Sequence, residues 1–536
     1  MADKKIKDPI YGYVYIPENI INSIIDTAQF QRLKNIVQTS YSSLYPSSLH
    51  NRFVHSLGVF HLGCIASESV RRSADESSQK IIEKYLSTFR TACLLHDVGH
   101  APFSHTGEYF YLKGGSREQL HKELQGLIND NEIEEEIVEC GYKAAPHELM
   151  SAIIGLEMYG NNIDDDNKSF FARCITGYKY SNKRDSEKDI QNCFIELLNS
   201  RILDVDKIDY LIRDAYMSGF ETVILDYERL LKNVFFGIYE DRYNIVFKKA
   251  ALSVFENVVF ANDLERRWIQ AHPAVVYESY LINKIMERII STWFSKYNYL
   301  PREILSLDGV GIPRYGRVIL GSDADIIYLM KNLKQDDIVT EYIDRQKRKH
   351  PLWKTEAEFQ AIFDGQSTII DSLEEVLHMM YHNQSASAIE INQDRLQQIE
   401  KDISEMSSAA KSDELYQDNY ESLSRQRDLI KVFEAYSKEQ GIPFDFVVLY
   451  TNQFNSGFRK QEFGDMLFEL PTIQKKCRFS EVNNTFSQNN SNRERFFYIY
   501  CSRKSDNTVP SLGALIDALM KFGGQLNAKK MSEKVR

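Results

Sequence analysis

Apolar and polar residues alternate at helical spacing along much of the chain, most regularly between Leu203 and Met217. One set of positions is apolar: Val205, Ile208, Leu211, Ile212 and Ala215. The polar residues Asp206, Tyr210, Arg213 and Asp214 fall on the other side. Since positions three and four apart share a helix face, the run predicts a helix that packs by one face and lines a polar pocket with the other. An ordinary solvated face is the competing interpretation.

Two further apolar runs place His and Asp in predicted helices. The run from Arg52 to Gly58 carries His55 near its start, and the run from Leu94 to His100 carries the doublet His96-Asp97 and ends at Gly99. A lone His on an apolar helix is usually a hydrogen-bonded core residue. An adjacent His-Asp pair is harder to explain by packing, because burying both side chains unpaired costs on the order of several kcal/mol.

The same patterning predicts a mainly α fold with a smaller α+β C-terminal lobe. Residues 13 to 290 have mostly helical spacing, whereas Phe444 to Tyr450 and Arg495 to Tyr500 have the aromatic and β-branched content of strands. We expect a large helical domain over 1–380, a polar helical excursion or linker over 381–426 and the α+β lobe over 427–536.

Composition narrows the class of protein. The 536 residues carry a net charge of −11, which disfavours a nucleic-acid-coating protein, since phosphate binding needs a basic surface. The seven Cys show neither paired spacing nor a zinc pattern, as expected in a reducing compartment. The N-terminus is polar and charged, and no apolar run approaches eighteen residues, so we expect neither a signal peptide nor a membrane span. The expected location is the cytoplasm.

Four of these residues form a candidate metal site. They are His55, His96, Asp97 and Asp206. Imidazoles combined with carboxylates suit Fe, Mn, Mg or Zn, with positions left for water and substrate. The sequence therefore predicts a divalent metal whose identity stays open.

Three motifs in order carry a family resemblance. Arg-Phe-x-His, then His-Asp-x-Gly-His-x-Pro-Phe-Ser-His, then Asp-Val-Asp-Lys-x-Asp-Tyr resemble the HD-domain deoxynucleoside triphosphate triphosphohydrolases, including animal members that also carry a SAM domain. The likeness begins at Asp8 with no SAM domain before it, and is dense to about Gly219. The resemblance implies a helical HD core and identifies 1–380 as an HD phosphohydrolase domain.

The resemblance also implies which residues supply the catalytic acid. His105 matches the family's catalytic His, and Glu108 its carboxylate partner, where Asp is the residue expected from the animal enzyme. His100 and His147 match further pocket histidines that contact phosphate or support His105. Because the stretch after His105 is longer than in the animal members, His121 is a rival for the position given to His147.

Substrate and activator residues follow from the same resemblance. Arg52 and Lys207 would grip the triphosphate, Tyr210 and Asp214 would contact the sugar, and Gln38 lies one residue out of register with a reader of the 3′ hydroxyl. Gln270 or Trp268 aligns with a base-flanking residue, although packing is the favoured role for Trp268. The family's activator positions align with Asp26, Gln31 and Lys34; a helix cap explains the same stretch equally well.

The function that the resemblance implies is cleavage of dNTPs to deoxynucleoside and inorganic triphosphate. Such an enzyme would control or deplete the dNTP pool, by analogy also in defence against phage, as an allosteric homo-oligomer, a dimer or a tetramer. One alternative is an HD phosphodiesterase or nuclease acting on oligonucleotides or cyclic nucleotides. Another is a non-catalytic nucleotide-sensing module.

Overall fold

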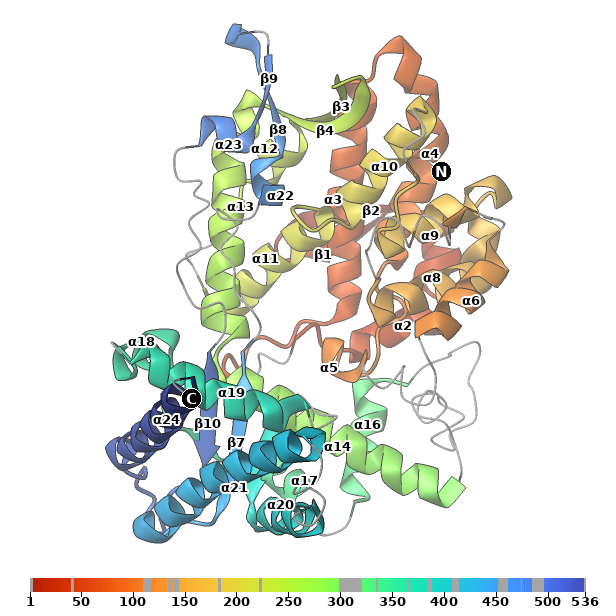
Figure 1. Ribbon diagram of the computed structural model, residues 1–536. Helices are drawn as coiled ribbons and strands as arrows, with labels where there is room; N and C mark the ends of the chain where they lie inside the picture. The colour runs from red at the N-terminus through yellow and green to blue at the C-terminus, as the bar shows by residue number, and fades with distance from the viewer. Residues whose placement is uncertain are drawn as a thin grey trace. The chain divides into compact units, whose positions relative to one another are not determined.

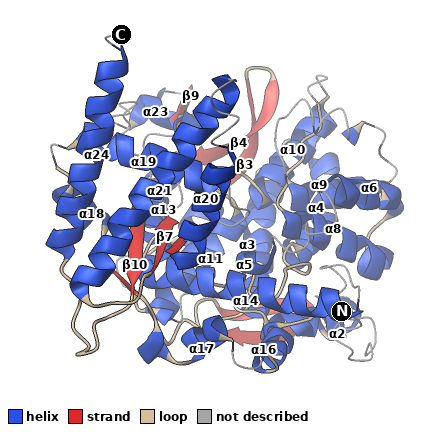
Figure 2. Cartoon of the chain, turned by 60° about the horizontal axis from the view of Figure 1, so that its bottom comes forward, coloured by secondary structure: helices blue, strands red, loops and turns tan. Residues whose placement is uncertain are grey.

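A computed structural model describes residues 3–39, 43–108, 117–128, 130, 132–133, 137, 144–181, 185–220, 224–297, 321–333, 336–364, 366–382, 388–406, 414–451, 461–473, 475–483 and 496–534. Helices dominate these residues and the strands form small sheets (Figure 2). The predicted mainly α class with a smaller α+β part is confirmed. Among the described helices, none combines the length and the apolar character that crossing a bilayer requires.

The chain folds into two compact units, each built from three segments. Unit 1 comprises Met1–Gln270, Ile282–Lys334 and Asn455–Ser491, and unit 2 comprises Ala271–Leu281, Gln335–Phe454 and Asn492–Arg536. This division rests on packing in the structure, whereas the ranges 1–380, 381–426 and 427–536 rest on sequence patterns. Those ranges stay a prediction.

Unit 1 holds the residues of the candidate site, on a group of packed helices (Figure 1). Its main helices are α2 (Ala28–Gln31), α3 (Arg52–Arg72), α4 (Glu76–Leu95), α5 (His105–Glu108), α6 (Arg117–Leu127), α8 (Pro146–Tyr159), α9 (Lys168–Thr176), α10 (Ser186–Leu198), α11 (Val205–Ser218), α12 (Tyr227–Leu231), α13 (Leu252–Glu265), α16 (Asp323–Lys331), α22 (Gln461–Gly464) and α23 (Phe479–Val482). Helix α3 packs against both α4 and α11. Helix α14 (Pro273–Tyr297) begins in unit 2 and continues in unit 1.

Two small sheets complete unit 1. An antiparallel hairpin pairs β1 (Asp3–Asp8) with β2 (Gly12–Pro17). The second sheet has the order β3-β4-β8-β9, from β3 (Val234–Tyr239), β4 (Arg242–Lys248), β8 (Leu467–Leu470) and β9 (Lys475–Arg478). The pairing of β4 with β8 is parallel, so the segment from 461 to 483 returns to unit 1. The stretch 13–290 is mostly helical, as predicted; the strands β3 and β4 and most of β2 are its exceptions among the described residues.

Unit 2 packs helices on a four-stranded sheet of order β5-β10-β7-β6. The strands are β5 (His350–Pro351), β6 (Ala388–Asn392), β7 (Asp445–Tyr450) and β10 (Phe497–Cys501), and the helices are α17 (Asp337–Ile343), α18 (Glu356–Ile362), α19 (Ser367–His382), α20 (Gln393–Met406), α21 (Glu414–Gln440) and α24 (Leu512–Lys534). Strands β7 and β10 overlap the two predicted strands, but Phe444 and Phe496 lie just before them, and Arg495 lies outside the described residues. In the polar stretch after residue 381, Leu396 and Ile399 are buried in this core.

Candidate metal centre and active site

Three helices of unit 1 present the predicted metal ligands, and each begins at a side-chain cap. The Asn51 side chain accepts a hydrogen bond from the Val54 amide, so α3 starts at Arg52 and carries His55 in its first turn. Helix α4 ends at Leu95, with His96 as its C-cap and Asp97 directly after it. Asp204 caps α11 by accepting from the Lys207 amide, which places Asp206 in the first turn. The ligands therefore lie at helix ends held by backbone geometry.

Glycine at position 58 allows α11 to approach α3. A Cβ atom added to Gly58 would lie 1.8 Å from the Asp209 carboxylate and 2.6 Å from the Arg213 guanidinium, both on α11. Either distance is shorter than any van der Waals contact. A side chain at this position would separate the helices that carry His55 and Asp206.

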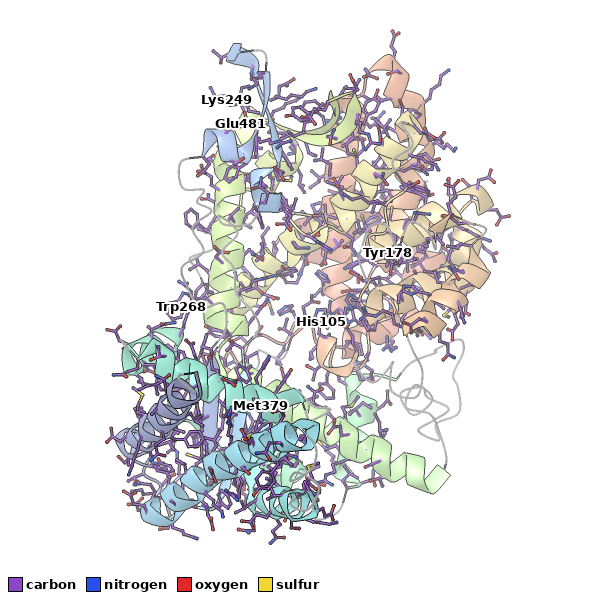
Figure 3. The ribbon with its side chains drawn as sticks, viewed as in Figure 1. His105, Tyr178, Lys249, Trp268, Met379 and Glu481 are labelled. Carbon is purple, nitrogen blue, oxygen red and sulfur yellow. The ribbon has the colours of Figure 1, made fainter. Side chains whose placement is uncertain are left out.

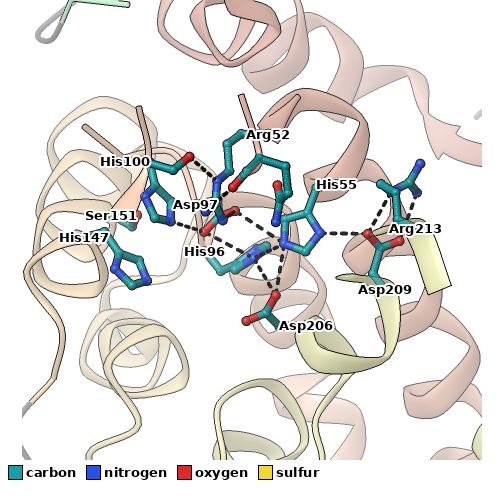
Figure 4. Close-up of polar contacts among 12 residues, drawn as sticks. Arg52, His55, His96, Asp97, His100, His147, Ser151, Asp206, Asp209 and Arg213 are labelled. Carbon is teal, nitrogen blue, oxygen red and sulfur yellow. Dashed lines mark hydrogen bonds and ion pairs between the residues drawn. The ribbon is translucent and has the colours of Figure 1, made fainter. Parts of the chain in front are cut away.

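The four predicted ligands converge on one small volume (Figure 4). His55 Nε2 lies 3.0 Å from Asp206 Oδ1, 3.2 Å from His96 Nε2 and 3.4 Å from Asp97 Oδ2. His96 Nε2 lies 3.7 Å from Asp206 Oδ1. His55, His96 and Asp97 are buried, and the Asp206 side chain is 35% exposed. One side of the cluster is thus open.

Charges in the cluster match a cation. Burial alone would raise the pKa of Asp97, yet Arg52 and the neighbouring His side chains hold it well below its ordinary value. Burial acts likewise on Asp206, and hydrogen bonds to His55 and His96 hold its pKa well below the ordinary value. Burial lowers the pKa of His55, but hydrogen bonds to Asp206 and Asp209 raise it to about 10. Two carboxylates therefore stay ionised around a proton that a metal ion would displace.

The donor set fits a divalent metal. His55, His96 and Asp97 can each offer one ligand atom within 4.8 Å of the others, and Asp206 adds a carboxylate oxygen on the open side. Two imidazole nitrogens with two carboxylate oxygens suit Fe, Mn, Mg or Zn. The chemistry of the donors does not choose among these metals.

A buried carboxylate that the sequence did not single out orients His55. Asp209 Oδ2 lies 2.7 Å from His55 Nδ1, and the Asp209 carboxylate also accepts hydrogen bonds from Arg213 and from the Tyr11 hydroxyl at 2.7 Å. Arg213 in turn lies 3.1 Å from Asp8. With Nδ1 held by Asp209, Nε2 is the nitrogen left for the metal. The sequence does carry one signal for this role: Asp209 and Arg213 lie four residues apart on the predicted helix, close to Asp206.

Replacing Asp209 with asparagine is expected to weaken metal affinity 10- to 100-fold and also to lower the stability of the fold, because the buried Arg213 loses a charged partner. An amide is nearly isosteric and can still pair with Tyr11, but it no longer holds the His55 ring as a carboxylate does, and loss of such a partner has this typical effect. Titration of the metal-free protein with Mn²⁺ measures the change. Unaltered affinity would contradict the orienting role.

A second cluster surrounds Glu108. Glu108 Oε1 lies 2.5 Å from His105 Nδ1, 2.9 Å from His147 Nδ1 and 3.6 Å from His100 Nδ1. His100 and His147 are stacked at 4.1 Å. His100 Nε2 also lies 3.0 Å from Asp97 Oδ1, which links this cluster to the metal ligands.

Protonation within this cluster follows from burial and pairing. Burial disfavours the Glu108 anion, but His147 and His105 hold its pKa well below the ordinary value. Burial lowers the pKa of His147, and Glu108 raises it to about 9. His105 is different because its side chain is 67% exposed (Figure 3). The rival His121 instead bonds the Tyr178 hydroxyl at 2.7 Å.

A cavity of about 420 Å³ opens beside both clusters. We call it the phosphate cavity; its lining includes His96, His147, Asp206, Lys207, Arg201 and Arg266. The Lys207 amine also bonds the Ser200 carbonyl and Asp204, each at 2.6 Å. Three cationic side chains therefore border a space that begins at the predicted metal ligands.

Two other predicted substrate residues are engaged within the protein. The buried Arg52 donates to Asp97 at 2.7 Å, to the Ser104 hydroxyl at 2.9 Å and to the Gln38 carbonyl. The Gln38 amide oxygen is buried without a hydrogen-bond partner among the described residues. Arg52 thus holds Asp97 in this structure, and its predicted grip on the triphosphate stays a prediction.

Asp214 and His50 form a buried pair on the same side of α11 as Tyr210. His50 Nε2 lies 2.6 Å from Asp214 Oδ1. Burial raises the pKa of Asp214 to about 7 and lowers that of His50 to about 3. Both shifts disfavour charge, so the pair is neutral below about pH 7 and becomes negative as Asp214 ionises above it.

The Asp214 shift predicts a pH-dependent gain in stability for Asp214→Asn. Because the folded pKa lies above the unfolded value of about 3.9, the native protein loses stability as pH rises from about 4 to 7. Asparagine does not titrate, so the Asp214→Asn variant does not lose stability in this way as pH rises. We expect its gain over wild type to be up to about 4 kcal/mol larger at pH 8 than at pH 4. Urea unfolding at both pH values measures it, and equal differences at both would contradict the shift.

The predicted activator residues do not line the phosphate cavity. Asp26 lies 4.0 Å from the Lys4 amine, Gln31 bonds the Ile25 carbonyl, and the Lys34 amine lies over the Phe53 ring. These contacts are those of ordinary packing, and the activator site stays a prediction. The Trp268 side chain is 44% exposed beyond the end of α13 (Figure 3), and packing as its role stays a prediction.

Comparisons with known proteins place this geometry in a family context. The HD domain family matches residues 52–150. The chain is 32% identical over 239 residues to the deoxynucleoside triphosphate triphosphohydrolase SAMHD1 homolog of Dictyostelium discoideum, covering 43% of this chain and 39% of that protein. It is 30% identical over 266 residues to an uncharacterized protein of Mycoplasma genitalium, covering 48% of this chain and 53% of that one.

The similarity to curated relatives is partial in length. The chain spans about half or less of the relatives it matches. A solved structure of a hypothetical protein from Aquifex aeolicus matches the fold over 97% of this chain and 99% of its own, with a TM-score of 0.55 and 18% identity. The predicted family resemblance is confirmed: the chain contains an HD domain and has homologues among deoxynucleoside triphosphate triphosphohydrolases.

Proposed function

Starting from the HD domain at residues 52–150, we propose that this chain hydrolyses deoxynucleoside triphosphates to deoxynucleoside and inorganic triphosphate. The observation that carries the proposal is the phosphate cavity, which is lined both by the predicted metal ligands His96 and Asp206 and by the cationic side chains Lys207, Arg201 and Arg266. A substrate in which a chain of several phosphates adjoins the bond to be cleaved matches that arrangement. The similarity to deoxynucleoside triphosphate triphosphohydrolases supports the same substrate class.

The cationic side chains bind the phosphate chain. Arg201 and Arg266 can each present two parallel donors to phosphate oxygens, and Lys207 acts as a compact charge near the start of α11. The α11 N-terminus adds a favourable dipole for anions. These groups hold the triphosphate so that its α-phosphorus lies at the metal ligands.

The metal ligands would be His55, His96, Asp97 and Asp206. A divalent ion held there would lower the pKa of water and screen phosphate charge. Asp209 fixes the His55 ring and Arg52 fixes Asp97, so the ligand atoms are held before substrate arrives.

The departing 5′ oxygen needs a proton, because a nucleoside alkoxide is a strong base. His105 is suited to supply it: Glu108 holds Nδ1, which leaves Nε2 for the substrate. His147, 2.9 Å from Glu108 Oε1, would hold Glu108 in place from the buried side. The proton moves from His105 Nε2 to O5′ as the bond between phosphorus and O5′ breaks.

Residues further along α11 face the nucleoside. Asp214 with its His50 partner would bond the 3′ hydroxyl, and Tyr210 beneath the 2′ carbon would exclude ribonucleotides. Depletion or control of the dNTP pool would follow from turnover. An activating nucleotide and a homo-oligomer stay part of this proposal.

Product analysis in ¹⁸O-water tests the proposal. The protein is incubated with the four dNTPs and, in parallel, the four NTPs, with Mn²⁺, Mg²⁺ or Fe²⁺. Deoxynucleoside and triphosphate carrying one ¹⁸O, with NTPs spared, are expected. Monophosphate with pyrophosphate would overturn the predicted bond cleavage. Products only from oligonucleotides or cyclic nucleotides would favour the phosphodiesterase alternative, and nucleotide binding without turnover in any metal would favour the sensing module.

A further inference from the structure

A second cavity of about 330 Å³ adjoins the phosphate cavity. We call it the distal cavity; residues that line it and not the phosphate cavity include Lys179, Glu196, Ile202, Leu203, Ile245 and Met466. Asn199, Ser200, Arg201 and Glu462 line both cavities. The two cavities therefore lie on either side of these four residues, with Arg201 at the border of both.

The order of these spaces follows the axis of α11. Asp206 is the second residue of the helix, while Tyr210 and Asp214 lie about 6 and 12 Å further along it. The segment from 199 to 203, which lines the distal cavity, precedes the helix. The nucleoside residues and the distal cavity thus lie toward opposite ends of α11, with the metal ligand Asp206 between them.

The walls of the distal cavity differ from those of the phosphate cavity. Ile202, Leu203 and Ile245 give it apolar surface, with Met466 beside them. Leu203 and Ile245 are buried. Charged side chains lie at its border, where Lys179 pairs with Glu196. A phosphate group gains nothing from apolar walls, whereas a planar heterocycle does, and the volume suits a small ligand group.

We propose that the distal cavity binds a second nucleoside, joined to the far end of the phosphate chain, so that 5′,5′-dinucleoside polyphosphates are substrates. The inference rests on the proposed function, because it takes the reacting nucleoside to lie at Tyr210 and Asp214. Arg201, which borders both cavities, binds the phosphates that lead into the distal cavity.

The reaction balances with water as the only co-reactant. Water oxygen bonds to the phosphorus next to the reacting deoxynucleoside, the bond from that phosphorus to O5′ breaks, and O5′ takes a proton from His105, which the proton lost by water restores. A deoxyadenosine-tetraphosphate-adenosine substrate then gives deoxyadenosine and adenosine 5′-tetraphosphate.

The test compares kcat/KM for deoxyadenosine-tetraphosphate-adenosine and for dATP on the wild-type protein. We expect the dinucleoside substrate to be favoured at least about tenfold, the scale for burying one apolar ring. In Ile202→Trp, which fills the distal cavity, the ratio should fall to about one. Ile224→Trp, at a side chain 84% exposed, is the matched control and should keep the wild-type ratio.

The outcomes separate the two proposals. Cleavage of dATP with a ratio near one in the wild type overturns the distal site alone. Absence of dATP cleavage under every metal overturns the proposed function. If Ile202→Trp fails to fold, Met466→Trp repeats the test from another wall of the cavity, and an unchanged preference in that variant overturns the inference.

Discussion

Replacing His105 with alanine is expected to lower kcat about 10²- to 10⁴-fold, the usual contribution of a positioned general acid. Glu108 holds His105 Nδ1, and no other described imidazole pairs with Glu108 while remaining so exposed. Because the side chain is 67% exposed, its removal leaves no core cavity; metal content should stay unchanged, and the melting temperature should fall slightly because Glu108 loses one of its partners. Steady-state kinetics with dNTPs and metal analysis measure both effects.

His121→Ala is the matched control for the loss of an imidazole. His121 bonds the Tyr178 hydroxyl and contacts neither Glu108 nor the metal ligands. Its loss should change kcat by no more than a few-fold. Unchanged turnover in His105→Ala, or an equal loss in both variants, would refute the acid role of His105.

Local sequence pattern was sufficient to predict the elements that carry the metal ligands. The helical spacing after Asp206 and the apolar runs around His55 and His96 reflect interactions within one or two turns. Helix α11 accordingly begins at Val205 and ends at Ser218, and its C-cap Gly219 has a φ of +71°, which suits glycine. The same locality explains why the strands at β7 and β10 were recognisable from their own residues.

Contacts between distant segments could not be predicted in this way. The hydrogen bond from Tyr11 to Asp209 joins residues 198 positions apart, and the parallel pairing of β4 with β8 brings Glu462 to the phosphate cavity. Neither leaves a periodic trace in the sequence. The hairpin of β3 and β4 was missed for a local reason: its turn uses Glu240 and Asp241 at positive φ, without the glycine that marks such turns.

Replacing Asp206 with asparagine is expected to abolish metal binding and to lower turnover at least about 10³-fold. The ligand is the exposed member of the cluster, with its side chain 35% exposed, so the fold should tolerate the change. The amide is a weaker ligand than the carboxylate and removes one of two negative charges that balance a divalent ion. Metal supplies several kcal/mol of transition-state stabilisation in such hydrolases, which accounts for the size of the loss.

Thermal stability gives a readout of Asp206 that does not depend on catalysis. Metal at 100 times its Kd stabilises a native protein by about 2.7 kcal/mol, so the wild-type melting temperature should rise on adding Mn²⁺. Asp206→Asn should show no such rise. Asp166→Asn, which changes an exposed carboxylate that is not a predicted metal ligand, should respond as the wild type does. An Asp206→Asn protein that retains full metal occupancy and the melting shift would remove Asp206 from the ligand set. Its loss of activity would then have to arise from substrate binding at the open side of the cluster.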